Sequence, residues 1–262
     1  TEINISDVTE ELGAWLTIEL MNSPLDKEEA LQLALYTHRH HPLVAVENVD
    51  PNATAKFEKI NHHIMSKTPS GPGVYNQYVN NNPKRLDRPA LMVGTMATGP
   101  GSTAAALQSL TLDLFYENQL DAVINDRTLI PKAVNESLRF RAGVGRFTRT
   151  VTENVILHDT FLKAGDRIAI CLESANRDPA NWIDPDKFLI HRTDKTKHLA
   201  WGHGVHSCIA LAISKEMIRI YLKTLLDKVG KYEILTKPED LEYVLMFGGN
   251  ISMMSNIILR KL

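Results

Sequence analysis

Hydrophobic positions in the first part of this 262-residue chain recur with a helical period. Ser6 is expected to cap a helix that runs from Val8 to Leu20. Asp26, followed by Lys27-Glu28-Glu29, has the form of an N-cap with a capping-box acid, and predicts a second helix continuing towards His38. The segment 68–88 is rich in Pro, Gly and Asn, and predicts a loop after these helices.

Beyond the loop, an apolar stretch from Pro89 to Tyr116 predicts one long helix, and a short helix is expected near 118–122. A further helix should begin around Pro131, because proline suits the first turn. Alternating polar and apolar positions then predict short strands. These fall at 149–152, 155–157, 167–170, 232–235 and 251–259, the last two closing a small C-terminal sheet. The expected fold class is mainly α with small β-sheets (α+β).

The most informative chemical pattern is Trp201-Gly202-His203-Gly204-Val205-His206-Ser207-Cys208. Two glycines permit tight backbone turns, and the cysteine stands where a helical pattern of Ile209, Ile213 and Met217 begins. A helix N-terminus presents positive dipole charge and free N–H groups, which favour a thiolate. A thiolate placed in this way is suited to be an axial ligand of haem iron.

Three other blocks precede this one in the chain. Glu136 and Arg139 have the i, i+3 spacing that puts both side chains on one helix face. Pro185, Phe188 and Arg192 form a PxxFxxxR pattern, and the string 175–179 reads Ala-Asn-Arg-Asp-Pro. Together with the cysteine block, they closely resemble the ExxR, PxxFxxxR and haem-binding loop motifs of cytochrome P450.

The resemblance implies the fold, cofactor and site residues of that family. Haem b would be bound with Cys208 as the axial ligand of its iron, in a loop containing Trp201, Gly202 and Gly204. Arg149 and His206 would contact the haem propionates. Glu136, Arg139 and Arg192 would form the family's structural Glu–Arg–Arg triad.

The distal side of the haem departs from the family pattern. The segment Thr98-Gly99-Pro100-Gly101-Ser102-Thr103 lies where the family has an AGxDT-like motif with an acid–alcohol pair. Gly101 replaces the acid, Ser102 keeps the alcohol and Thr103 is its neighbour, so Ser102 and Thr103 are the candidate catalytic residues. Pro100, flanked by glycines, is expected to kink or open the helix.

The chain resembles only part of a P450, because the N-terminal sheet and early helices of the family are missing. It is expected to be one haem domain over 1–262, with mid-domain helices in 1–67, a loop at 68–88 and a haem-binding core in 89–262. Either a naturally minimal protein or a fragment would give this pattern. The open faces favour a homodimer or a partner subunit.

The composition of the chain limits the partners and the cellular location that can be expected. The net charge is −2 with 23% charged residues, which implies no general attraction to nucleic acid or to a membrane surface. No apolar run approaches 18 residues and no signal peptide is visible, so a cytoplasmic location is expected. The only cysteines are Cys171 and Cys208, which argues against a disulfide framework.

The favoured function is oxidation of a small organic molecule, as a monooxygenase served by a ferredoxin or reductase or as a peroxygenase using peroxide. Because the distal acid is lost, peroxide is slightly favoured over dioxygen as the oxidant. The alternatives are a redox-neutral haem isomerase or dehydratase, and a non-catalytic haem-binding sensor, scaffold or partner subunit. The sequence does not identify the substrate.

Five clustered histidines could bind zinc or act as acid–base groups, although no supporting cysteine or carboxylate spacing accompanies them: His38, His40, His41, His62 and His63.

Overall fold

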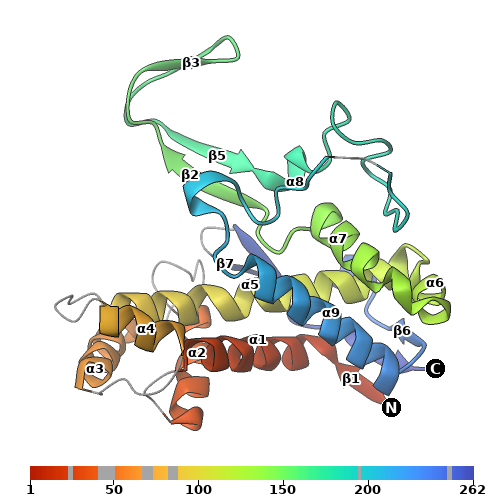
Figure 1. Cartoon of the computed structure of the whole chain (residues 1–262), viewed down its shortest axis with the longest axis horizontal. Helices are drawn as coiled ribbons and strands as arrows, with labels where there is room; N and C mark the ends of the chain where they lie inside the picture. Colours follow the sequence, from red (N-terminus) through yellow and green to blue (C-terminus); the bar gives the residue numbers. More distant parts are fainter. Residues whose placement is uncertain (23–25, 41–50, 67–72, 82–87, 194–195, 247–249) are drawn as a thin grey trace.

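The computed structural model describes residues 1–22, 26–40, 51–66, 73–81, 88–193, 196–246 and 250–262. It is mainly helical, with small antiparallel sheets at its edges. The long helix α5 (Arg88–Tyr116) crosses the middle of the molecule, with α1 (Ile5–Met21) packed along it (Figure 1). The 3-10 segments are η1 (Arg127–Leu129), η2 (Gly204–His206) and η3 (Pro238–Asp240). The remaining helices are α2 (Lys27–His40), α3 (Ala53–Ser66), α4 (Val74–Asn81), α6 (Leu120–Asn125), α7 (Ile130–Phe140), α8 (Leu172–Ala175) and α9 (Leu211–Lys228).

The strands pair in four small antiparallel sheets among the described residues. One has the order β1-β9-β6, and the others are the pairs β2–β5, β3–β4 and β7–β8. In the first sheet Leu259 is opposite both Ile3 and Ile234, which brings the two chain ends together (Figure 1). The strands are β1 (Glu2–Asn4), β2 (Arg146–Thr150), β3 (Val155–Leu157), β4 (Thr160–Leu162), β5 (Arg167–Cys171), β6 (Tyr232–Ile234), β7 (Tyr243–Met246), β8 (Ile251–Met254) and β9 (Ile258–Lys261).

Several sequence predictions need correction. Asn4, not Ser6, caps α1: its side chain accepts from the Ser6 backbone N–H at 3.0 Å, and Ser6 lies inside the helix. The predicted loop 68–88 contains the helix α4, and the rest of that segment lies largely outside the described residues. The C-terminal sheet expected from 232–235 and 251–259 is confirmed in part: β6 pairs with β9, whereas β8, at the start of 251–259, pairs with β7 in a separate sheet. The Asp26 cap is confirmed, since its carboxylate accepts from the Glu29 N–H at 3.0 Å.

The main apolar core lies between α5, α7 and α9, where Leu107, Val134 and Leu222 are fully buried. A second apolar cluster joins α1 to α2 and α4. One buried amide ties three elements together: Gln108 on α5 donates to the Thr9 hydroxyl on α1 at 3.1 Å and accepts from the Met254 N–H on β8 at 2.9 Å. Because both ends of the amide are satisfied, its burial fixes how these elements meet. No helix in the described ranges has the length and apolarity to cross a membrane.

Helices α1 and α5 cross at unusually close range where Gly13 faces Pro100. A Cβ atom added at Gly13 would lie 2.6 Å from the carbonyl oxygen of Pro100, and one added at Gly99 would lie 2.6 Å from the Thr17 hydroxyl oxygen. Both helices therefore need glycine at the crossing.

Replacing Gly13 with alanine is expected to destabilise the protein by about 1–3 kcal/mol, because the new methyl group forces two backbones apart. Gly94→Ala is the matched control, since a Cβ at this α5 position has nothing within 4 Å. It should raise stability by up to about 1 kcal/mol through helix propensity. Urea unfolding of both variants checks the prediction, and equal effects would contradict the steric argument.

Candidate active site

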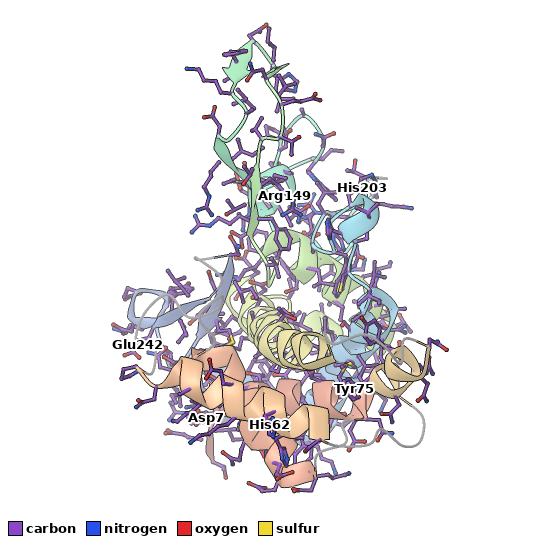
Figure 2. All side chains as sticks on the ribbon, turned by 90° about the vertical axis from the view of Figure 1, so that its left-hand side faces the viewer. Asp7, His62, Tyr75, Arg149, His203 and Glu242 are labelled. Carbon is purple, nitrogen blue, oxygen red and sulfur yellow. The ribbon has the colours of Figure 1, made fainter. Side chains whose placement is uncertain are left out.

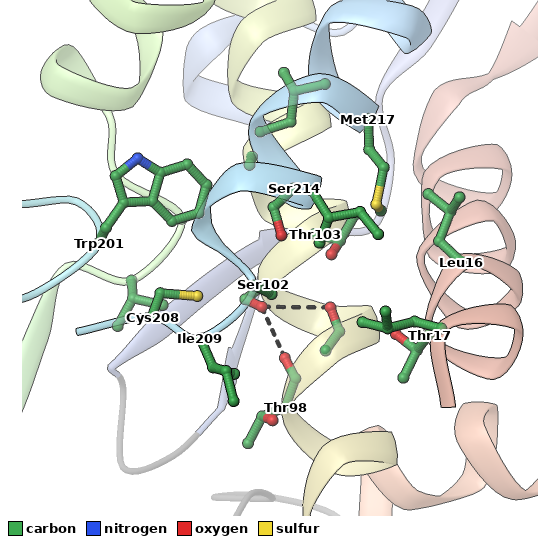
Figure 3. Close-up of a pocket in the computed structure, with 18 of the residues that line it drawn as sticks. Leu16, Thr17, Thr98, Ser102, Thr103, Trp201, Cys208, Ile209, Ser214 and Met217 are labelled. Carbon is green, nitrogen blue, oxygen red and sulfur yellow. Dashed lines mark hydrogen bonds between the residues drawn. The ribbon is translucent and has the colours of Figure 1, made fainter. Parts of the chain in front are cut away.

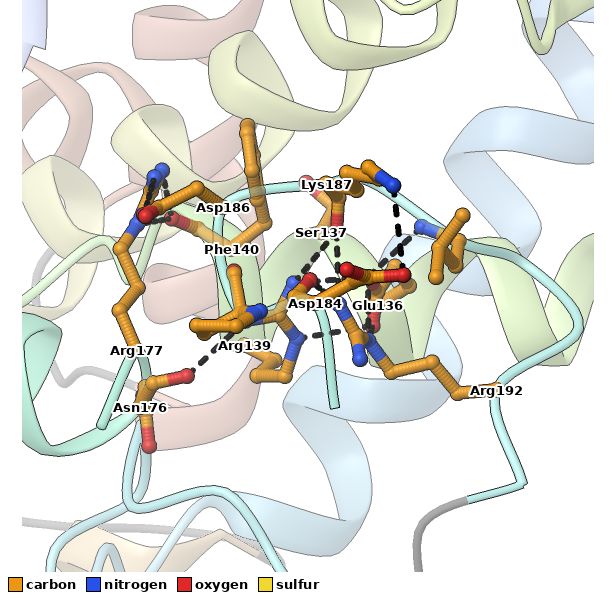
Figure 4. Close-up of polar contacts among 12 residues, drawn as sticks. Glu136, Ser137, Arg139, Phe140, Asn176, Arg177, Asp184, Asp186, Lys187 and Arg192 are labelled. Carbon is orange, nitrogen blue, oxygen red and sulfur yellow. Dashed lines mark hydrogen bonds and ion pairs between the residues drawn. The ribbon is translucent and has the colours of Figure 1, made fainter. Parts of the chain in front are cut away.

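Glu136 forms the centre of a buried ion cluster on α7 (Figure 4). Its carboxylate accepts from Arg139 at 2.8 and 3.0 Å, and from Arg192 Nε at 2.8 and 2.9 Å. The Leu189 N–H adds a bond of 2.8 Å to the same carboxylate. The structure thus brings Glu136, Arg139 and Arg192 together, although Arg192 is distant in sequence.

The Arg139 guanidinium also binds backbone carbonyls in the segment that follows α7. Arg139 donates to the carbonyls of Asn176, Pro185 and Lys187 at 2.8–3.0 Å. Asn176 is fully buried, and its side-chain oxygen accepts from the Leu199 N–H at 2.7 Å. The cluster is therefore connected through Asn176 to the segment that leads into the cysteine loop, and it positions that loop.

The cysteine loop closes on itself through backbone hydrogen bonds. The Cys208 N–H donates to the Trp201 carbonyl at 2.8 Å, and the Gly202 N–H donates to the Leu199 carbonyl at 2.8 Å. Gly202 and Gly204 have φ values of +70° and +74°, a backbone conformation that favours glycine. This geometry leaves the Cys208 side chain exposed beside a cavity.

Helix α9 begins at Leu211, which corrects the expectation that it starts at the cysteine. The Leu211 N–H donates to the Cys208 carbonyl at 3.3 Å, so the cysteine lies one turn before the helix. Ile209 consequently belongs to the loop, where its side chain is 97% exposed. Ile213 and Met217 do lie on α9 as the periodicity indicated.

A cavity of about 440 Å³ lies between the loop, α5, α9 and α1 (Figure 3). On the loop side it is lined by Trp201, His206 and Cys208, and on the α5 side by Ser102 and Thr103. No carboxylate, lysine or arginine is among the described residues that line it; the polar side chains are hydroxyls, His206 and the cysteine. Such an apolar cavity with a few polar groups is typical of a cofactor or small-molecule site.

The α5 wall of the cavity is continuous helix across Pro100, so the predicted opening of the helix is wrong, whereas the kink expected as its alternative stays a prediction. Ser102 instead turns its hydroxyl back along the helix, donating to the Thr98 carbonyl at 2.8 Å and sharing a weaker bond of 3.3 Å to the Gly99 carbonyl (Figure 3). Helix α1 packs closely against this segment, where Gly13 faces Pro100.

The comparison with known proteins decides the family. The family profile described as Cytochrome P450 matches residues 118–254, which is more than half of the chain. The chain belongs to the cytochrome P450 family.

Two proteins with similar sequences support this P450 assignment. Cytochrome P450 107B1 of Saccharopolyspora erythraea is 32% identical over 164 residues, covering 61% of this chain and 40% of the relative. Pulcherriminic acid synthase of Bacillus subtilis is 34% identical over 143 residues, covering 51% of this chain and 35% of the relative. The matched regions thus span well under half the length of these relatives.

Solved P450 structures show the same fold over the whole chain. CalO2 superposes with a TM-score of 0.86 at 18% identity, covering 100% of this chain and 68% of CalO2. Cytochrome P450 CREJ, solved with (4-ethylphenyl) dihydrogen phosphate, gives a TM-score of 0.87 at 16% identity and is covered to 67%. This P450 chain therefore contains about two thirds of a complete P450 fold.

The cavity of this P450 fits the haem of its family in two respects. Cys208 lines the cavity, and its sulfur is the type of soft donor atom that haem iron accepts. Two large apolar side chains of the cysteine loop lack protein cover: Ile209, which lines the cavity, is 97% exposed, and Val205 is 99% exposed. Exposed apolar groups clustered around one ligand-type side chain indicate a surface that an apolar group covers.

The two residues predicted to meet the propionates differ in position. His206 lines the cavity, as expected for a residue at its edge. Arg149 on β2 does not line it: its guanidinium lies 5.6 Å from the Phe147 ring and donates to the Thr148 carbonyl at 2.9 Å. Phe147, two residues earlier and on the same strand face, is a lining residue, so Arg149 is next to the cavity rather than in it.

Neither His62 nor His63, the two histidines of the cluster whose side chains the structure describes, lines this P450 cavity. His62 is exposed, and His63 lies 3.5 Å from a carboxylate oxygen of Glu29 on α2. His41 and the side chains of His38 and His40 lie outside the described residues. Within the part of the chain that the structure describes, no group of three or more His, Cys, Asp or Glu side chains could hold a metal ion.

Sequence reasoning missed a second buried polar group, centred on Asp113 near the end of α5. Its carboxylate accepts from the Ser137 hydroxyl at 2.7 Å and from Arg141 Nε at 3.0 Å. Burial raises the pKa of Asp113 to about 6, although Arg141 and the hydrogen bonds oppose the increase. The Asp113 group links α5 to α7, the helix that carries Glu136 and Arg139. No spacing of residues in the sequence predicts this group.

Because the pKa of Asp113 is higher in the folded protein, its contribution to stability is present below pH ~4 and is lost as the pH rises through ~6. The difference in unfolding free energy between the wild type and Asp113→Asn should therefore fall by about 3 kcal/mol from pH 3.5 to 7. Urea titrations across this range measure it. A constant or rising difference would contradict the direction of the pKa shift.

Proposed function

We propose that this chain forms the catalytic core of a haem–thiolate oxidoreductase that oxidises a small organic molecule, with peroxide as the oxidant slightly favoured over dioxygen plus a ferredoxin or reductase. The observation that carries the proposal is the position of Cys208 at a cavity whose α5 wall carries Ser102 and Thr103. Sequence relatives named monooxygenase or epoxidase support the reaction class, among them the steroid C26-monooxygenase of Mycolicibacterium smegmatis and the cyclomarin C epoxidase of Salinispora arenicola.

Haem b supplies the redox chemistry when bound, with its iron held by the sulfur of Cys208. Trp201 packs at the cavity wall beside the cysteine loop, and Gly202 and Gly204 provide the turns that present the sulfur. His206 at the cavity edge, and Arg149 after a side-chain rotation, would oppose the negative charge of the propionates. Pairing of this kind offsets the cost of removing a carboxylate from water.

The choice of oxidant follows from the proton donors of the cavity. Dioxygen must be given two electrons and two protons before its O–O bond breaks, and an acidic side chain usually delivers the protons. Gly101 occupies the position of that acid, and the described lining residues include no carboxylate. Hydrogen peroxide brings the electrons and protons itself: R–H + H2O2 gives R–OH + H2O, with no external reductant.

Ser102 is the proposed proton-handling residue. Its hydroxyl now donates to the Thr98 carbonyl at 2.8 Å, and a rotation about χ1 would turn the same hydrogen into the cavity. A hydroxyl both donates and accepts, so it can relay a proton without a pKa near neutrality. Thr103 lines the same wall and is the neighbouring hydroxyl.

Ser102→Ala is expected to lower peroxide-driven turnover about 100-fold, at the low end of what general acid–base groups contribute, without loss of haem. Guaiacol oxidation by the haem-loaded chain with hydrogen peroxide measures this. Ser214→Ala, which removes a hydroxyl from the α9 wall of the cavity, is the control and should have little effect. Equal rates for both variants would remove Ser102 from the mechanism.

The same preparation tests the function as a whole. Turnover with peroxide that exceeds turnover with NADPH, ferredoxin and ferredoxin reductase supports the peroxygenase form, and the reverse supports the monooxygenase form. Retained haem without turnover in either assay would support the alternative of a haem-binding sensor, scaffold or partner subunit. Haem-dependent turnover of a substrate without any oxidant would indicate an isomerase or dehydratase.

A further inference from the structure

His198 lies at the entrance to the cysteine loop, and its ring is partly buried. Its Nδ1 atom accepts a hydrogen bond from the Ala200 N–H at 3.3 Å. The neighbouring N–H, that of Leu199, donates to the side-chain oxygen of Asn176 at 2.7 Å. The Asn176 carbonyl in turn accepts from Arg139 at 2.9 Å (Figure 4). Two side-chain acceptors therefore hold the loop entrance, and of these only the imidazole takes up a proton in mild acid.

The position of Cys208 depends on this entrance through the backbone. The Gly202 N–H donates to the Leu199 carbonyl, and the Cys208 N–H donates to the Trp201 carbonyl, both at 2.8 Å. Each acceptor carbonyl belongs to the short stretch 199–201 that follows His198. A displacement of this stretch would therefore move the cysteine with it.

The surroundings of His198 favour the neutral ring. Nδ1 can accept a hydrogen bond only while it carries no proton, so the proton of the neutral ring is on Nε2. The charged groups that act on the ring are Lys215 from α9, and Glu136 and Arg139 from α7. Burial and the Lys215 cation lower the pKa of His198 to about 4, and Glu136 opposes them only in part. The fold thus stabilises the form of the ring that the hydrogen bond to Ala200 requires.

We propose that His198 is a positioning residue of the cysteine loop, which holds the loop entrance as a neutral acceptor and releases it when Nδ1 gains a proton. The protonated Nδ1 would present a donor to the donor N–H of Ala200. It would also add a cation beside Lys215 and Arg139. The loop should therefore open in acid before the neighbouring helix α7 does. This role does not depend on the proposed function, because the hydrogen bonds of the loop lie within the chain itself.

Hydrogen–deuterium exchange followed by mass spectrometry tests the proposal on the chain without haem. The closed loop binds fewer protons than the open loop between the folded pKa of about 4 and the ordinary pKa of about 6.5, so acid favours opening. After correction for intrinsic exchange, the protection of amides 199–208 in the wild type should fall about 50-fold from pH 7 to 4.5. The amides of α7 should keep their protection over the same range, which separates loop opening from global unfolding.

His198→Asn separates the acceptor from the titrating ring. The Asn side-chain oxygen can accept from the N–H two residues ahead, yet it takes up no proton. This variant should match the wild type at pH 7 and lose less than about threefold in protection by pH 4.5. His198→Leu has no acceptor and should be about tenfold less protected already at pH 7. His191→Asn changes an exposed histidine earlier in the same segment, and as the matched control it should keep the wild-type pH profile.

Three results would overturn this role of His198. The first is a wild-type profile as flat as that of His198→Asn. The second is a His198→Asn variant as unprotected at pH 7 as His198→Leu, since the ring would then act by packing rather than as an acceptor. The third is loss of protection in α7 together with the loop in the wild type, since the acid effect would then be global.

Discussion

Replacing Glu136 with alanine is expected to prevent the chain from holding its fold. The substitution leaves Arg139, 1% exposed, and Arg192, 9% exposed, without their shared carboxylate. Removal of one partner from a buried ion pair typically costs 3–5 kcal/mol, and here two cations lose it together. The expected loss is therefore at least about 4 kcal/mol, a large part of the stability of a domain of this size. Urea unfolding followed by circular dichroism measures it.

Asp186→Asn is the control for Glu136→Ala, because it also removes a carboxylate that pairs with an arginine. Asp186 lies 3.2 Å from Arg177 but is 81% exposed. Exposed pairs of this kind contribute at most about 1 kcal/mol, so this variant should unfold almost like wild type. If both variants lost the same stability, burial would not be the reason for the importance of the triad.

Replacing Cys208 with alanine is expected to abolish the thiolate signature of the haem-bound protein completely. The long-wavelength absorption band of the reduced, carbon monoxide-bound form depends on sulfur ligation, and no other described lining residue carries a thiol. Peroxide-driven guaiacol oxidation by the Cys208→Ala variant should also fall. The spectrum of reconstituted protein before and after addition of carbon monoxide provides the measurement.

Cys171→Ala provides the matched control, because Cys171 is the other exposed free cysteine and ends β5 outside the cavity. Its spectrum should equal that of the wild type. An unchanged band in Cys208→Ala would assign the iron to another ligand. A shorter-wavelength band in the wild type would mean that the sulfur is protonated or displaced.

Local sequence signals predicted the long helices well, but they missed α4 and predicted the small sheets less well. The run from Pro89 to Tyr116 was confirmed as α5, and the proline at the first turn marked the start of α7. Strands β1, β4 and β7 were missed, because three or four residues carry too little periodicity to stand out. The pairing of β9 with β1 joins segments from opposite ends of the chain, which no local pattern encodes.

The sequence by itself determined the family and the residues that carry its motifs, because ligation and ion pairing need particular side chains at fixed spacings. Glu136, Arg139, Arg192 and Cys208 could all be named from the chain. The tertiary structure alone decided what surrounds them. Asp113 meets Arg141 across 28 positions, and Gly13 on α1 lies directly against Pro100 on α5. Such contacts depend on how helices cross, and crossing is set by the packing of the whole core rather than by any short segment.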